Sequence, residues 1–204
     1  MKYIIVLPDG VADSPIASLG HKTPLQVATH PNIDWIAREG VTGWAHTIPS
    51  GFAPGSDVGC MSVFGYDPRK HHTGRAPLEA AAQGILLKPD EVAFRCNTLT
   101  VENGVMIDHS ADHITTEESR RLMEMVGQQL GGNGVRYYPG VSYRHLTVVQ
   151  GASFAETTCT PPHDILGKPI SGYLPSGPGS DTLRQHMERS VKLLADHPVN
   201  RARL

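Results

Sequence analysis

The spacing of hydrophobic positions changes twice within the first fifty residues. Residues 2–7 are a continuous apolar run that Pro-Asp-Gly stops at 8–10, and such a run between turn formers predicts a buried strand. Residues 23–40 carry apolar positions at helical spacing in two clusters divided at Pro31, and Gly40 suits a left-handed helix end. Residues 41–49 alternate as a strand does. This order predicts the βαβ start of a parallel sheet, with strands 2–7 and 41–49 side by side.

The pattern after Pro68 is typical of an α+β region. Residues 78–85 predict a short helix, and residues 90–109 predict two strands around a turn at residues 102–104. Residues 115–132 give the strongest helical signal, with a Thr cap, Glu in the first turn, an apolar face and glycines at the end. Residues 135–151 predict two more strands, and a last helix is expected over about 180–196.

Composition narrows the class of protein. The 204 residues allow one large domain or two small ones. With 19% charged residues and a net charge of -2, nothing marks a nucleic-acid or membrane partner. Cys60, Cys96 and Cys159 are far apart without a C-x-x-C spacing, which favours a reducing compartment. The first apolar run is too short for a signal peptide or membrane span, so the sequence predicts a cytoplasmic protein.

Ser56 and Asp9 are the first residues with candidate chemistry. Ser56 follows Pro54 and Gly55 and precedes a segment of helical character, so its hydroxyl is either a helix N-cap or a nucleophile. Asp9 ends the first predicted strand, where open α/β sheets place ligand-binding groups, although an Asp there is often only a turn residue. If both lie at neighbouring strand ends, they can share a cation that activates the serine.

Arginine and histidine residues form a second candidate set. Arg75, Arg95 and Arg144 lie beside small or turn residues and can hold a phosphate or carboxylate bidentately, or form ordinary surface ion pairs. His109 and His113 are four residues apart, which on a helix makes a metal-binding face. Their segment joins a strand to a helix, so it offers phosphate-binding donors equally well.

Nine motifs follow one another along essentially the whole chain: PDGVAD, LGHKTPLQVATHPNID, PGSDVGCMSVFGYDP, TGRAPLEAAAQGI, VAFRCN, DHSADHI, YPGVSYRHL, PPHDI and HPVNRAR. In this order they resemble the cofactor-independent phosphoglycerate mutases of the archaeal type, in the alkaline phosphatase superfamily. The resemblance is greatest to a bacterial branch proposed to contain homoserine kinases.

The resemblance implies an α/β fold in which a phosphatase-like parallel core is interrupted by an α+β substrate domain. Residues 1–68 would be the N-terminal part of the metal-binding core, and residues 69–204 the inserted domain. Asp9 would be a metal ligand at a site for two divalent ions, either manganese, zinc or magnesium. Ser56 would be both helix cap and metal-bound nucleophile, taking the phosphoryl group of 3-phosphoglycerate and returning it to the other hydroxyl. The residues expected to face this small phosphorylated acid are Arg75, Arg95, His109, His113, Arg144 and His145. Of these, Arg95, His109, Arg144 and His145 are expected to share one concave surface.

Two departures from the family pattern change these expectations. Asp112 stands where the family usually has Gly, which adds a negative charge beside a pocket for an anion. The chain has about half the family's usual length, and Asp9 and Ser56 alone cannot hold two cations. We therefore expect an N-terminal fragment of an isomerase that needs its C-terminal half. The alternatives are a phosphotransferase of the homoserine kinase type, for which the sequence has no G-x-x-x-x-G-K-[ST] loop, and a non-catalytic phosphoacid-binding remnant.

Overall fold

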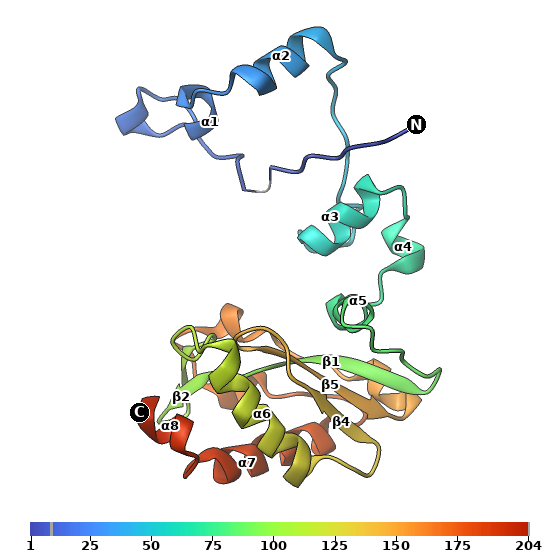
Figure 1. Ribbon diagram of the computed structural model, residues 1–204, viewed down its shortest axis with the longest axis vertical. Helices are drawn as coiled ribbons and strands as arrows, with labels where there is room; N and C mark the ends of the chain where they lie inside the picture. Colours follow the sequence, from blue (N-terminus) through green and yellow to red (C-terminus); the bar gives the residue numbers. More distant parts are fainter. Residues whose placement is uncertain (9, 204) are drawn as a thin grey trace. The chain divides into compact units, whose positions relative to one another are not determined.

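The computed structural model describes residues 1–8 and 10–203, and the chain divides into the units Met1–Thr47 and Ile48–Leu204, which are described separately below. Figure 1 labels the main elements. The elements of the first unit are η1 (Ala17–Leu19), α1 (Pro24–Val27) and α2 (Pro31–Glu39). Those of the second unit are α3 (Ser56–Val63), α4 (Pro68–His71), α5 (Arg75–Ala82), β1 (Glu91–Asn97), β2 (Thr100–Glu102), β3 (Val105–Asp108), α6 (Thr116–Leu130), β4 (Val135–Tyr138), β5 (Arg144–Gln150), η2 (Ala152–Glu156), η3 (Pro162–Ile165), η4 (Ile170–Tyr173), α7 (Ser180–Leu194) and α8 (Pro198–Arg203).

The helices of the first unit follow the sequence pattern. Thr23 caps α1 in a reciprocal capping box with Gln26, and Pro31 occupies the first turn of α2, where its missing N–H costs no hydrogen bond. Gly40 ends α2 as predicted, but its φ of -100° is extended. The expectation of a left-handed cap at this glycine is therefore wrong.

The expected parallel strands over residues 2–7 and 41–49 are absent from this structure. Among the described residues, none before Glu91 belongs to a strand. Ile4 and Trp44 are 86% and 102% exposed. A strand needs a neighbour for its backbone N–H and C=O groups, and neither run pairs with one in the described part of the chain.

The second unit contains an antiparallel sheet in the order β1-β5-β4 and a separate β2-β3 hairpin. In the larger sheet, Ala93 pairs with Val148 and Arg95 with Leu146, and the register runs without a break. In the hairpin, Asn103 and Gly104 have φ values of 49° and 76°, as a two-residue turn with two left-handed positions requires. The mixed helix and sheet composition is confirmed, whereas the described ladders are all antiparallel.

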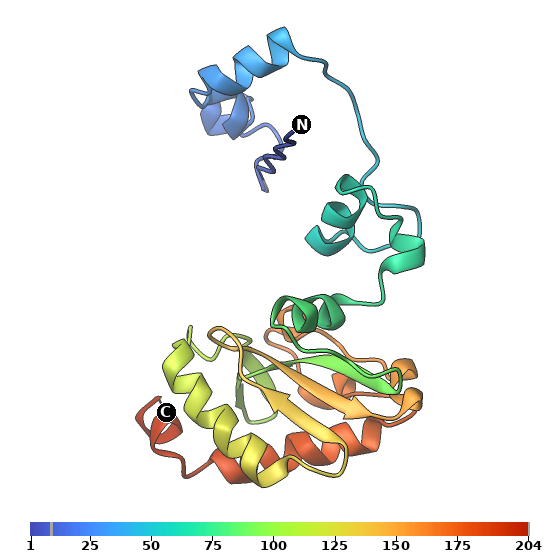
Figure 2. The same cartoon turned by 45° about the vertical axis from the view of Figure 1, so that its right-hand side comes forward.

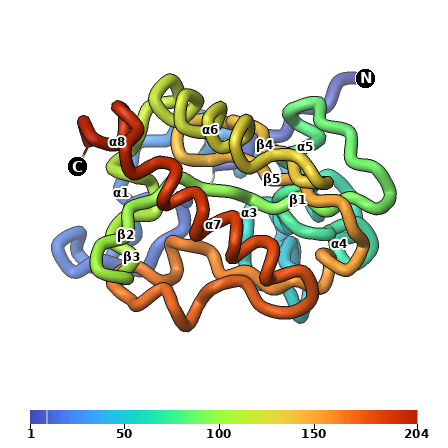
Figure 3. Tube along the Cα trace, turned by 90° about the horizontal axis from the view of Figure 1, so that it is seen from below, coloured from blue at the N-terminus to red at the C-terminus, as the bar shows by residue number. Residues whose placement is uncertain are grey.

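Helices cover both faces of the three-stranded sheet, as Figure 2 shows for α5 and α7. On one face α5 packs Ala76 and Ala80 against Ala93, Leu146 and Val148. On the other face, α6 contributes a cluster that also includes side chains of β1, β4 and α7: Met123, Val126, Leu130, Cys96, Tyr137, Leu193 and Leu194. Figure 3 shows α7 in front of the sheet with α6 beside it. The face toward α5 is the one that carries the candidate site.

Helix α6 confirms the clearest helical prediction. Thr115 accepts a hydrogen bond from the backbone N–H of Glu118, and the Glu118 carboxylate accepts one from the Thr115 N–H. This capping box satisfies two donors that the first turn would otherwise leave unpaired. No helix in the described residues is both long enough and apolar enough to span a bilayer.

Candidate active site

Helix α3 places Ser56 at its first position. Gly55, not Ser56, holds the cap position, and the Gly55 carbonyl accepts the hydrogen bond from the Gly59 N–H. The prediction that Ser56 is the cap residue is therefore wrong by one position. Its hydroxyl lies instead in the first turn of the helix, whose positive dipole end favours an anion.

Asp57, the next residue, links α3 to α4 and α5. Its Oδ2 lies 2.6 Å from His72 Nε2, and its Oδ1 lies 3.2 Å from Arg75 Nε. Burial alone raises the pKa of the Asp57 carboxyl, but the hydrogen bond with His72 and the charge of Arg75 outweigh it and hold the pKa below its usual range. Asp57 is therefore ionised at neutral pH and orients both neighbours.

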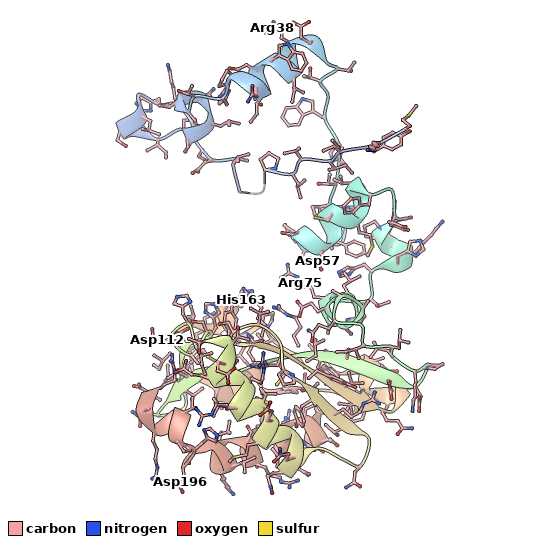
Figure 4. All side chains as sticks on the ribbon, viewed as in Figure 1. Arg38, Asp57, Arg75, Asp112, His163 and Asp196 are labelled. Carbon is pink, nitrogen blue, oxygen red and sulfur yellow. The ribbon has the colours of Figure 1, made fainter. Side chains whose placement is uncertain are left out.

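An open cavity of about 250 Å³ lies at this junction, lined by Ser56, Asp57, Arg75, Leu78 and Glu79. Figure 4 shows Asp57 and Arg75 on adjacent helices at this position. Arg75 begins α5 directly after Gly74, whose φ of 118° suits glycine alone. The cavity thus brings together two helix starts, a serine hydroxyl and a guanidinium, which is a donor set for a phosphate.

Arg95 reaches the same region through α5. It lies on β1 on the face that α5 covers, because it alternates with Ala93 and pairs with Leu146. Its Nε is 3.0 Å from Glu79 Oε1. Glu79 lines the cavity with Ser56 and Arg75, so its contact with Arg95 links Arg95 to the edge of this cavity.

Arg144 and His145 point to opposite faces of the sheet. They are consecutive in β5, where successive side chains alternate. Arg144 shares the α5 face with Leu146, whereas His145 is 1% exposed on the other face and accepts a hydrogen bond from the Gly140 N–H at 3.1 Å. Burial lowers the pKa of His145 to about 4, so it is neutral at pH 7. The expectation that His145 shares a substrate surface with Arg144 is therefore wrong.

His109 and His113 lie in a left-handed turn, not on a helix. Ala111, Asp112 and His113 have φ values of 50°, 52° and 51°, so the spacing of four residues does not make a helical metal face. Asp108 closes the turn by accepting hydrogen bonds from Ser110 and from the Asp112 N–H. Asp tolerates the left-handed region better than most residues, which explains how Asp112 fits where the family pattern has Gly.

His109 contacts the start of β5 rather than His113. Its ring meets Tyr143 edge to face at 5.6 Å between centroids. The Arg144 guanidinium lies over the Tyr143 ring, 4.4 Å from its centre. His109 and Arg144 therefore form one group, while His113 is exposed and bonds through its N–H to the Ser110 hydroxyl.

Asp9, the expected metal ligand, lies outside the described residues. Among the described residues, no three His, Cys, Asp or Glu side chains come together as a metal site. Asp57, the carboxylate nearest Ser56 in sequence, is engaged by His72 and Arg75. These residues do not by themselves fit the expected two-metal centre.

Asp57, His72 and Glu79 are site residues that the sequence analysis did not single out. Asp57 lies inside a motif that carries the resemblance and His72 directly before the next one, but their pairing depends on how α3 and α4 fold back on each other. Glu79 is four residues after Arg75. On a helix this spacing places both side chains on the same face, so it could have indicated that Glu79 lies at the site.

Comparison with known proteins identifies the family of this chain. Residues 37–200 match the model of the family described as 2,3-bisphosphoglycerate-independent phosphoglycerate mutase. The chain belongs to this family. It is 53% identical over 204 residues to the phosphoglycerate mutase of this type from Methanothrix thermoacetophila, covering 100% of this chain and 51% of that protein. It is 48% identical over 208 residues to a probable mutase of this type from Geobacter sulfurreducens, covering 100% of this chain and 52% of that protein.

Two solved structures are similar to this one. The cofactor-independent phosphoglycerate mutase from Thermoplasma acidophilum has 30% identity and a TM-score of 0.55, with 95% of this chain and 52% of that chain covered. A protein from Pyrococcus horikoshii has 26% identity and a TM-score of 0.67, with 95% and 44% covered. The chain therefore spans about half the length of the curated relatives that it matches.

Proposed function

We propose that this chain is the phosphoryl-accepting and substrate-binding part of a phosphoglycerate mutase that interconverts 3- and 2-phosphoglycerate. One observation carries the proposal: in a member of this family, Ser56 shares a cavity with Arg75 at the starts of two helices. A serine in this position has donors around it for the phosphate it would receive.

The proposed reaction is two in-line phosphoryl transfers. The Ser56 hydroxyl oxygen attacks phosphorus and gives up its proton, the bond to the glycerate oxygen breaks, and that oxygen takes up one proton, so that phosphoserine and free glycerate form with no net change in protons. Glycerate then turns within the site, and its other hydroxyl attacks the phosphoserine and releases Ser56. Glycerate must stay bound between the two transfers, so its carboxylate needs charged side chains that hold it in the site. We assign this task to Arg75, Arg95, His109, His113 and Arg144.

No step of this proposal passes through a metal ion, because the described residues do not supply a ligand set. Asp9 remains a proposed ligand. The other ligands would come from the half of the relatives that this chain does not match. The dependence of the intact protein on manganese, zinc or magnesium is therefore a question for the assay below.

We also propose that residues 1–68 contribute to a phosphatase-like parallel core in the intact protein and that residues 69–204 form its inserted substrate domain. The exposed apolar side chains of the first unit support this arrangement, since Ile4, Val6, Val41 and Trp44 are 81–102% exposed. Apolar residues of this size are normally covered. We propose that the remaining half of the protein covers them.

The test is a coupled enolase assay on a protein extended to the length of its relatives. Ser56→Ala is expected to abolish turnover, since no other hydroxyl among the described residues lines the cavity. Ser62→Ala is the matched control, because Ser62 lies in the same helix but does not line the cavity. Mass spectrometry should find a phosphoserine peptide that contains Ser56. The 204-residue chain alone should be inactive with each metal.

Full activity of the Ser56→Ala protein would reject the nucleophile assignment. Turnover by the 204-residue chain alone would reject the need for the second half. Activity that persists after chelation of divalent ions would show that the mutase does not depend on them.

A further inference from the structure

His163 lies beside His109, although 53 residues separate them in the sequence and no site residue so far comes from that region. The two imidazole rings are 6.1 Å apart between centroids, at an interplanar angle of 66°. His109 also contacts Tyr143, and the Arg144 guanidinium lies over the Tyr143 ring. Two imidazoles and one guanidinium therefore gather from η3, the end of β3 and the start of β5.

The segment that carries His163 is fixed to β3 by backbone hydrogen bonds. The Met106 N–H donates to the Lys168 carbonyl, the Gly167 N–H donates to the Met106 carbonyl, and the Ile170 N–H donates to the Gly104 carbonyl. Ile165, two residues after His163, is buried. The His163 ring therefore stands on a rigid support next to the end of the same strand that carries His109.

The start of β5 is fixed in the same way. The Ser142 N–H donates to the Thr116 hydroxyl, and the Ser142 hydroxyl donates to the Ile114 carbonyl. The Thr98 N–H donates to the Tyr143 carbonyl. All three segments are thus held in place without any ligand, which is the preorganisation that a binding site needs.

Each histidine of this group has a neighbouring carboxylate in the described part of the chain, but at long range. His163 Nε2 lies 3.5 Å from Asp164 Oδ1, and His109 Nδ1 lies 4.0 Å from Asp108 Oδ1. Both distances exceed that of a good hydrogen bond. The side chains of His163 and His109 are 50% and 33% exposed, so a ligand can reach both.

We propose that His163 binds the anionic group of the substrate together with His109 and Arg144. Two rings 6.1 Å apart can donate to different oxygens of one tetrahedral or planar anion, because each hydrogen bond spans about 2.8 Å. The ligand chemistry is a phosphate or carboxylate. Figure 4 labels His163 on the side of the sheet where Arg75 also lies. This inference rests on the proposed function, which supplies a substrate with both groups.

The experiment is an NMR titration of the 204-residue chain labelled at histidine, with inorganic phosphate, glycerate and 3-phosphoglycerate as separate probes at fixed pH. The His109 and His163 signals should move together, with one dissociation constant, when 3-phosphoglycerate is added. A response to phosphate alone identifies the phosphoryl group as the ligand, and a response to glycerate alone identifies the carboxylate.

Two variants separate binding from packing. His163→Phe keeps an aromatic edge against His109 but has no donor, and it should weaken 3-phosphoglycerate binding by about tenfold. His163→Gln keeps one donor and should lose less. The control is His21→Asn in the first unit, which removes an exposed imidazole and suits the left-handed φ of 59° at that position.

The outcomes distinguish this inference from the proposed function. If 3-phosphoglycerate shifts His109 while His163 stays unmoved, or if His163→Phe binds as tightly as the parent, His163 is not a ligand and the proposed function stands. If no probe shifts either histidine, this site is rejected, because all three of its side chains are present in this chain. The mutase function is rejected separately, by the Ser56 assay.

Discussion

Gly55→Ala is expected to disturb the pair between Asp57 and Arg75 without distorting the backbone. The φ of Gly55 is -165°, which any residue adopts, so the cost comes from space alone. A Cβ added here would lie 2.5 Å from Asp57 Oδ1 and 3.1 Å from Arg75 Nη2. The carboxylate would have to retreat by about half an ångström to reach even a tight 3.0 Å contact, and its contact with Arg75 Nε, now 3.2 Å, would lengthen.

The expected magnitude follows from two contributions. Ala is a poorer cap residue than Gly by roughly 0.5 kcal/mol. Weakening the pair with Arg75, whose side chain is 45% exposed, costs at most about 1 kcal/mol, because solvent screens it. Gly59→Ala in the same helix is the matched control. Its Cβ would meet only Ile48 Cδ1, at 3.6 Å, and the gain in helix propensity is about 0.5–1 kcal/mol. The two variants should therefore differ by about 2 kcal/mol, with opposite signs.

The assay combines urea unfolding with NMR titration of the Asp57 carboxyl. The pKa of Asp57 lies below its usual range in the folded protein, so its stabilising contribution is present above the unfolded pKa and is lost as pH falls through the folded pKa. Gly55→Ala should raise the pKa of Asp57 toward its usual range and flatten this acid dependence. Equal stability of the two alanine variants, with the pKa of Asp57 unchanged in both, would refute the geometry described at Gly55.

Two further predictions concern residues around the site. Arg203→Met should lower the free energy of unfolding by about 1–3 kcal/mol, because Arg203 donates to Glu118 and to two carbonyls of the turn at 111–112. The control, Arg201→Met, removes an exposed ion pair with Asp196 and should lower the free energy of unfolding by less than about 0.5 kcal/mol. Equal losses in urea unfolding would contradict the stabilising role of Arg203. The folded pKa of His145, about 4, lies below the ordinary 6.5. Its contribution to the free energy of unfolding should therefore be fully present above pH 6.5 and fall by up to about 3 kcal/mol as the pH drops toward 4. His145→Leu should abolish this pH dependence in acid unfolding curves, and an unchanged dependence would show that another group titrates.

The parts of the fold that depend on neighbours in sequence could be predicted. The capping box of Thr115 and Glu118 and the turn at Asn103 and Gly104 are set within a few residues, so their patterns are sufficient. The strands expected over residues 2–7 and 41–49 depend on a partner strand. An apolar pattern predicts that a segment is buried, but it does not identify the segment that packs against it.

The candidate site shows the same limit at the level of single side chains. Arg144 and His145 belong to one motif, yet the strand directs them to opposite faces, and only the strand assignment with its facing helices reveals this. The pairing of Asp57 with His72 depends on how α3 and α4 fold back on each other, which no local pattern encodes. The cap at Gly55 rather than Ser56 is a shift of one residue, and helix boundaries are rarely fixed more closely from sequence.

The charges at the cavity explain how an anion can be accepted beside two carboxylates. Asp57 is paired with His72 and Arg75, and Glu79 is paired with Arg95. Both contacts to arginine involve Nε, so each guanidinium is oriented by a carboxylate. An arginine held in this way loses less side-chain entropy when it binds a phosphate. The carboxylates therefore reduce the attraction of this region for an anion, but they also fix the two arginines that would bind the phosphate and carboxylate of the proposed substrate.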